Sequence, residues 1–197
     1  MKKINKLFQK TFVLLFILSI KVEAEILAIG NSDAKVTVKV FSSLTCPHCA
    51  DFHASIFNQL KEEYIKKGLV KFEHYAFPLD LAALNAELII RCQKDNEKKF
   101  QLLEEIYKKQ NIWAVGSDID KINNLLKKIA LSFNLTNNKM DVCLANSITQ
   151  DEILNQRIEA QKKYKISSTP TIIVNEKKYK GKIDYKEFKK VIKKNIK

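Results

Sequence analysis

The chain has 197 residues, of which 46% are hydrophobic and 29% are charged, and its formal net charge is +13. This length and composition are typical of one soluble globular domain with a full core. The basic charge invites a nucleic-acid-binding function, but the only arginines are Arg91 and Arg157, and acidic residues lie between the scattered lysines. Because there is no arginine-rich stripe and no nucleic-acid motif, we expect no nucleic-acid partner.

Residues 1–24 have the pattern of a signal peptide. A lysine-rich start precedes an apolar run over residues 12–20, and small residues follow at Val22 and Ala24. We therefore expect cleavage after Ala24 and export to the periplasm, where disulfides persist. The run is much shorter than the roughly 20 residues that span a bilayer. An uncleaved membrane anchor and a buried core helix are the alternative interpretations.

Residues 25–78 predict a strand–helix–strand unit. A β-branched, apolar segment is followed by a helix that begins at Cys46, with apolar side chains at every fourth position from Phe52 to Tyr64. Gly68 should end this helix. The two predicted strands cover residues 36–41 and residues 69–77.

Residues 79–164 are helical in their periodicity, and residues 165–197 return to strands and a closing helix. The helices are expected over residues 81–92, from about residue 96, over residues 120–131, and from Thr149, where Glu152 would complete a capping box. In the last part we expect a strand over residues 171–174, a turn over residues 175–177, a strand over residues 178–180, and a helix capped by Asp184.

Cys46 and Cys49 form a C-x-x-C motif between a strand and a helix, which is the context of a redox site. This spacing lets the two sulfurs close a small ring and lets the second thiol resolve a mixed disulfide formed by the first. The helix N-terminus stabilises a thiolate at Cys46, and His48 would add a cationic or hydrogen-bonding neighbour. An inert disulfide is one alternative for the pair.

Zinc ligation by the two cysteines with a histidine is the other alternative. Structural zinc usually has four ligands, and there is no second cysteine or histidine pair. We therefore expect no metal. His53 lies four residues after Cys49 and so shares its helix face, but packing or partial exposure is expected rather than a redox role. We also expect His74 to be a structural histidine and Trp113 to pack in the core or at a domain interface.

Residues 43–53, centred on Cys46-Pro47-His48-Cys49, resemble the active-site segment of DsbA-like proteins. The family's later motifs recur in order at residues 77–80, Cys92, residues 168–171 and residues 178–181. The resemblance spans nearly all of the mature chain. It implies an α/β protein with a thioredoxin fold, in which residues 25–78 and 165–197 form the fold and residues 79–164 are an inserted helical domain.

The resemblance also assigns roles to residues. Cys46 would be the nucleophile, Cys49 the resolving thiol, and Pro47 and His48 the other members of the catalytic motif. The Thr169–Pro170 bond would be cis, and both residues would bind substrate. The family often has a buried glutamate six positions before the nucleophile, but this chain has Val40 there. Any proton-transfer role of that acid must therefore fall elsewhere or be absent.

Cys92 and Cys143 lie in the predicted insertion, away from the redox motif. An exported protein with an even number of cysteines permits a second bridge, so we expect a structural disulfide between them. Two buried free thiols are the alternative.

Three functions remain open from the sequence. The leading one is an exported oxidase, without a cofactor, that introduces disulfides into unfolded or folding polypeptides with free cysteines. A DsbB-like membrane partner would then reoxidise Cys46 and Cys49. The second is a reductase or isomerase of the same fold, and the third is a redox-silent peptide-binding module.

Overall fold

The structure is a computed structural model that describes residues 26–196. The predicted signal peptide lies outside the described residues. Among the described residues, no helix is long and apolar enough to cross a membrane.

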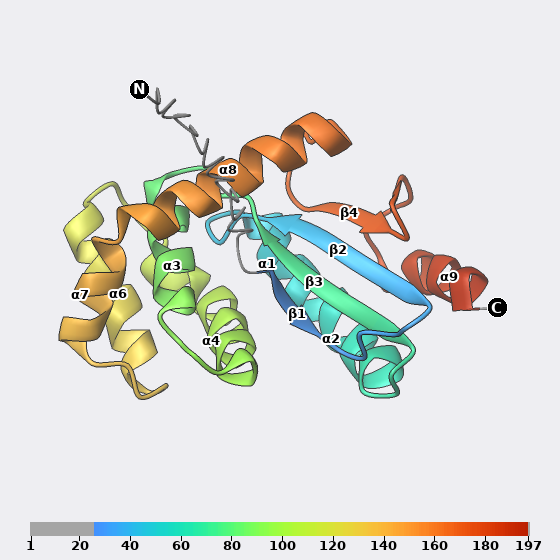
Figure 1. The fold of residues 1–197 in the computed structure, drawn as a ribbon, viewed down its shortest axis with the longest axis horizontal. Coiled ribbons are helices and arrows are strands. Elements are labelled where there is room, and N and C mark those ends of the chain that lie inside the picture. The colour runs from blue at the N-terminus through green and yellow to red at the C-terminus, as the bar shows by residue number, and fades with distance from the viewer. Residues whose placement is uncertain (1–25, 197) are drawn as a thin grey trace, which may run out of the picture.

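A five-stranded sheet lies at the centre of the fold (Figure 1). Its order is β1-β3-β2-β4-β5; β2 and β3 are parallel and the other neighbours antiparallel. β2 has neighbours on both sides, and its apolar residues Val36, Val38, Val40 and Phe41 are all fully buried. The strands are β1 (Leu27–Ile29), β2 (Val36–Ser42), β3 (Val70–Ala76), β4 (Thr171–Val174) and β5 (Lys177–Lys178).

One continuous helical segment follows β2, as predicted, and it alternates α-helical and π-helical turns. Its parts are α1 (Pro47–Phe52), η1 (His53–Phe57), α2 (Asn58–Leu60) and η2 (Lys61–Ile65). The predicted apolar stripe from Phe52 to Tyr64 is buried throughout. Gly68, at φ +69°, then turns the chain into β3.

Helices cover both faces of the sheet. On one face, the segment from α1 to η2 packs beside α9 (Tyr185–Ile196), where the rings of Phe52 and Phe188 lie 6.5 Å apart. On the other face, α8 (Ser147–Tyr164) covers Phe41 and Ile173. This division follows from the alternation of side chains along β2, because Val36, Val38 and Val40 enter the first core and Phe41 enters the second.

The remaining helices gather at one end of the molecule, opposite α9, and α8 runs from them across the sheet (Figure 1). Trp113 is fully buried in the main core, as expected. These helices are α3 (Leu81–Arg91), α4 (Asn96–Lys108), α5 (Gln110–Trp113), α6 (Ile119–Leu131) and α7 (Asn137–Leu144).

Two local predictions were wrong. Helix α8 begins at Ser147 rather than Thr149, because the side chain of Asn146 accepts the Thr149 backbone N–H and caps the helix first. The hairpin turn is also shorter than predicted. Asn175 and Glu176 both adopt positive φ, so Val174 already pairs with Lys177.

Candidate active site

Cys46 and Cys49 lie at the start of α1, at the carboxyl end of β2. Cys46 is the N-cap residue with an extended backbone, and its carbonyl accepts the N–H groups of Cys49 and Ala50 at 3.0 and 3.2 Å. Pro47 occupies the first helical position, where its lack of an N–H leaves no donor unpaired. The chain therefore places the Cys46 sulfur at the positive end of a helix.

The loop before β4 lies against this helix start. Because Phe41 pairs with Thr171 across the sheet, the residues just before β4 come next to those just after β2. The Cys46 thiol donates to the carbonyl oxygen of Thr169 at 3.4 Å, and the Thr169–Pro170 bond is cis. The structure therefore brings together the predicted catalytic residues and the two predicted substrate-binding residues.

The two thiols have opposite environments. Hydrogen bonding to the Cys49 side chain is the largest of the effects that lower the pKa of Cys46 to about 5. Burial opposes this, whereas the Thr169 side chain and the backbone N–H groups of Cys49 and His48 add to it. Burial is also the main cause that strongly raises the pKa of Cys49, which has no exposed surface. The site therefore favours a thiolate on Cys46 and a neutral thiol on Cys49.

His48 contributes less through its ring than expected. Its side chain is 83% exposed, and Nδ1 lies 3.9 Å from a carboxylate oxygen of Asp51. Its effect on Cys46 comes from the backbone N–H. A ring in open solvent has weak electrostatic influence, because water screens its charge.

Two long-range contacts that the sequence did not reveal hold the active-site turn. The amide of Gln110, from α5, donates to the carbonyl oxygens of Leu44 and Cys46 at 2.7 and 3.1 Å. The hydroxyl of Thr45 donates to Asp80, the N-cap of α3, at 2.7 Å. The helices after β3 thus clamp the turn from one side. No local sequence pattern marks Gln110, since its partners lie more than 60 positions away.

Beneath the motif lies a group of buried polar side chains. Val40, at the position of the missing acid, is fully buried and pairs in register with His74 of the neighbouring strand. His74 Nε2 lies at hydrogen-bonding distance, 2.8 Å, from Glu87 Oε1, which agrees with the expected structural role. His53 is buried, as expected for packing, and it stacks on Tyr107.

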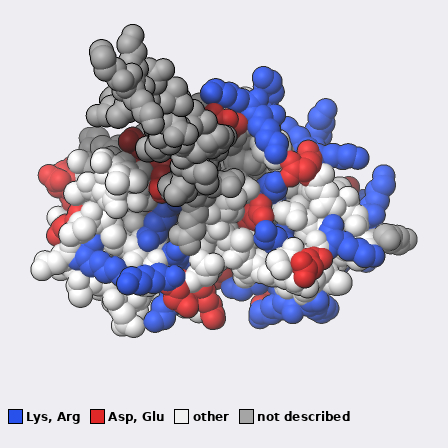
Figure 2. Space-filling view, in the orientation of Figure 1, with Lys and Arg blue, Asp and Glu red and all other residues white. Residues whose placement is uncertain are grey.

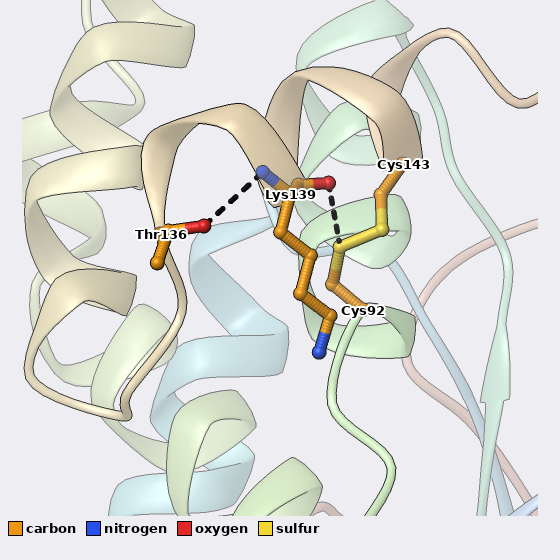
Figure 3. The surroundings of a disulfide bond; sticks show 4 residues. All are labelled: Cys92, Thr136, Lys139 and Cys143. Atoms are coloured by element: carbon orange, nitrogen blue, oxygen red, sulfur yellow. Dashed lines mark hydrogen bonds between the residues drawn. A yellow bond between two sulfur atoms is a disulfide. The ribbon is translucent and has the colours of Figure 1, made fainter.

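Cys92 and Cys143 lie apart from the redox motif and form a disulfide with a Cα–Cα distance of 5.9 Å (Figure 3). Cys92 is the C-cap residue of α3, and Cys143 lies in the last turn of α7. The bridge therefore ties the end of one helix to the end of another. Thr136 caps α7 by accepting the Lys139 N–H at 3.3 Å. This fixes the helix that presents Cys143 to its partner.

Lysines and acidic residues are interspersed over the visible face (Figure 2), without a single continuous basic stripe. Within residues 26–196, no group of three or more His, Cys, Asp or Glu side chains is arranged to hold a metal ion.

Comparisons with known proteins agree with this geometry. The sequence model of the thioredoxin family, described as Thioredoxin, matches residues 22–194. Disulfide bond formation protein D of Bacillus subtilis is 32% identical over 86% of this chain and 76% of its own length. A Rickettsia bellii protein named for protein-disulfide oxidoreductase activity is 31% identical, and this chain spans 63% of its length.

Solved structures show the same likeness. The crystal structure of Wolbachia pipientis alpha-DsbA1 superposes with a TM-score of 0.80 at 27% identity, covering 87% of this chain and 91% of that one. Oxidised BdbD from Bacillus subtilis superposes with a TM-score of 0.74 at 27% identity, covering 87% and 92%. The sheet and its inserted helices are thus those of a thioredoxin fold with a helical insertion. The chain belongs to the thioredoxin family, and it is a DsbA-like member of that family.

Proposed function

We propose that the protein is an exported thiol–disulfide oxidoreductase that introduces disulfide bonds into secreted or periplasmic polypeptides. The contrast between the two thiols carries this proposal: the pKa of Cys46 falls to about 5, whereas that of Cys49 rises. A stabilised Cys46 thiolate favours the reduced form of the pair, and a dithiol that is stable when reduced is an oxidant as a disulfide. The names of the relatives, disulfide bond formation protein D among them, support the same activity.

The proposed reaction moves two electrons from the substrate to the Cys46–Cys49 disulfide. A substrate thiolate attacks the Cys46 sulfur, and Cys49 leaves and takes up a proton. A second substrate thiolate then attacks the substrate sulfur of the mixed disulfide, and Cys46 leaves as a thiolate. Because a thiol of low pKa is a good leaving group, the environment of Cys46 speeds the second step.

The loop at Thr169 and Pro170 would hold the substrate. The Thr169 carbonyl already faces the Cys46 sulfur at 3.4 Å, so a chain that bonds to this sulfur must pass beside the loop. Thr169 is half-buried and Pro170 is buried, which leaves mainly the backbone of this segment to contact a partner. Backbone contacts do not select side chains, and this suits an enzyme that acts on many polypeptides. A DsbB-like membrane protein would then reoxidise the dithiol.

The test is a redox titration of the mature protein in glutathione buffers, with the dithiol followed by alkylation and mass spectrometry. We expect a potential more oxidising than that of the glutathione couple. A strongly reducing potential would support a reductase instead, and a dithiol that does not titrate would support a redox-silent peptide-binding module. Refolding of a substrate with scrambled disulfides would detect an isomerase. The Cys49→Ala variant is the control, because it should trap mixed disulfides through Cys46.

A further inference from the structure

Several buried polar atoms near Cys49 have no hydrogen-bond partner among the described residues. An unpaired buried polar group destabilises a fold, so apolar side chains of the same shape would be more stable here. Phenylalanine in place of His53 or Tyr107 would leave no polar atom unpaired at that position. The atoms are Ser42 Oγ, both ring nitrogens of His53, Nδ1 of His74, the hydroxyl of Tyr107 and Oγ1 of Thr169.

Two of these side chains, His53 and Tyr107, stack on each other, and His53 belongs to the helical segment that contains Cys49. His53 lies one helical turn after Cys49 and shares its face. Its ring stacks on that of Tyr107, with centroids 4.3 Å apart and an angle of 22° between the planes. Burial, and then the negative charge of Cys49, raise the pKa of Tyr107. The charge of Glu87 also raises it, whereas interaction with the Ser42 side chain lowers it.

Other titratable groups face His53 from the surrounding elements. His74 of β3 lies 6.3 Å away, ring to ring, with its Nε2 bound to Glu87 of α3. Lys61 of η2 forms an ion pair with Glu104 of α4 at 2.7 Å. Burial, and then the charges of His74 and Lys61, keep the pKa of His53 well below its usual value. His53 is thus neutral, with one ring nitrogen that donates and one that accepts.

A cavity of about 660 Å³ connects this stack with solvent. It lies between the first helical segment and α4, and His53 and Tyr107 form part of its wall. The rest of the wall includes charged side chains that can exchange protons with water: Asp51, Glu104, Glu105 and Lys108. Since His53 and Tyr107 are each only 3% exposed, a proton on either side chain would reach solvent through this wall.

Cys49 needs such a route. It has no exposed surface, yet every catalytic cycle removes and restores its proton. We propose that the Tyr107 hydroxyl and the His53 ring form the proton-transfer path between the Cys49 thiol and this cavity. The Tyr107 hydroxyl can rotate its hydrogen, and a neutral His53 ring has one donor and one acceptor nitrogen, so each group can pass a proton on without movement of its ring.

In the reaction of the reduced protein with oxidised glutathione, the loss of the Cys49 proton can be measured separately from the attack by Cys46. The Cys46 thiolate attacks one glutathione sulfur, which forms a mixed disulfide and releases the first glutathione thiolate. The Cys49 thiol then loses its proton through Tyr107 and His53, and its sulfur attacks Cys46, which closes the protein disulfide and releases the second glutathione thiolate. Two protein thiols are oxidised and one glutathione disulfide is reduced. This step belongs to dithiol exchange in either direction, so it does not depend on the oxidase function proposed above.

The experiment measures both steps by rapid mixing, acid quench and mass spectrometry in wild type, Tyr107→Phe and His53→Phe. Each variant keeps an aromatic ring and loses the polar atoms. We expect the attack by Cys46 to be unchanged and the closing step to slow by about 10²-fold, the lower end of the range for positioned proton transfer. The mixed disulfide should then accumulate. The closing rate of the variants should rise tenfold per pH unit, because hydroxide replaces the lost path.

Tyr64→Phe is the matched control, since Tyr64 is also a buried tyrosine of the main core. It should close at the wild-type rate, and circular dichroism should show all variants folded. Closing rates within about twofold of wild type in Tyr107→Phe and His53→Phe would overturn the proposal. Equal slowing of both chemical steps would also overturn it, because that would mark a general structural effect rather than loss of a proton path to Cys49.

Discussion

Removing the Cys92–Cys143 disulfide should destabilise the fold by an amount that its loop length sets. The bridge closes a loop with a sequence separation of 51, from the end of α3 to the last turn of α7. In the chain-entropy description, a loop of this size corresponds to about 4 kcal/mol at 25 °C. At 2–4 °C per kcal/mol for a protein of this size, the melting temperature should fall by about 8–16 °C.

Thermal melts followed by circular dichroism can distinguish the stability lost with the covalent bridge from the stability lost with the packing of the two sulfurs. Cys92→Ala, Cys143→Ala and the double variant each lack the bridge completely, so each should lose about the same 4 kcal/mol. Activity in a thiol-oxidation assay should persist, because Cys46 and Cys49 are intact. If the double variant loses the sum of the two single losses, the effect comes from side-chain packing and the loop argument fails. A loss below about 1 kcal/mol would refute it as well.

Three further outcomes follow from the site. At about pH 6, iodoacetamide should label Cys46 and spare Cys49, because the pKa of Cys46 is about 5 and that of Cys49 is raised. Labelling of Cys46 should slow as the pH falls through 5, and a labelled Cys49 peptide would contradict this prediction. Gln110→Leu should lose about 1–3 kcal/mol in urea unfolding, since two backbone carbonyls lose their donor, and an unchanged midpoint would show that these bonds are dispensable. Glu87→Ala should lose about 3 kcal/mol because it leaves a buried histidine unpaired, whereas exposed Glu97→Ala should lose almost nothing.

The sequence predicts local features of this fold well because their causes are local. The apolar spacing from Phe52 to Tyr64 requires only that one helix face be buried, and Asp184 caps α9 by accepting the Glu187 N–H, three residues away. The three residues of β1 were not predicted, because so short a segment has no measurable period and depends on its pairing with β3. The start of α8 was misplaced because Asn146 and Thr149 are both good caps.

The candidate site likewise combines features that the sequence predicts with features that it does not. The motif around Cys46 and the segment at Thr169 could be found from sequence, since both consist of neighbouring residues. The contacts of Gln110 and the stacking of His53 on Tyr107 could not, because they join residues from separate elements. The spacing from Cys49 indicates which face His53 occupies, but nothing in it indicates which side chain that face meets.

Helix α8 makes the insertion and the sheet interdependent. It contains 18 residues, about 27 Å of helix. Near its middle, Gln156 accepts a hydrogen bond from Arg91 of α3 at 3.3 Å, and the next residue, Arg157, lies 5.1 Å from the ring of Phe77, which directly follows β3. Excising residues 79–164 would therefore expose the second core of the sheet, including Phe41, to water. The insertion is thus not a detachable module, because without α8 the sheet would need another apolar cover on this face.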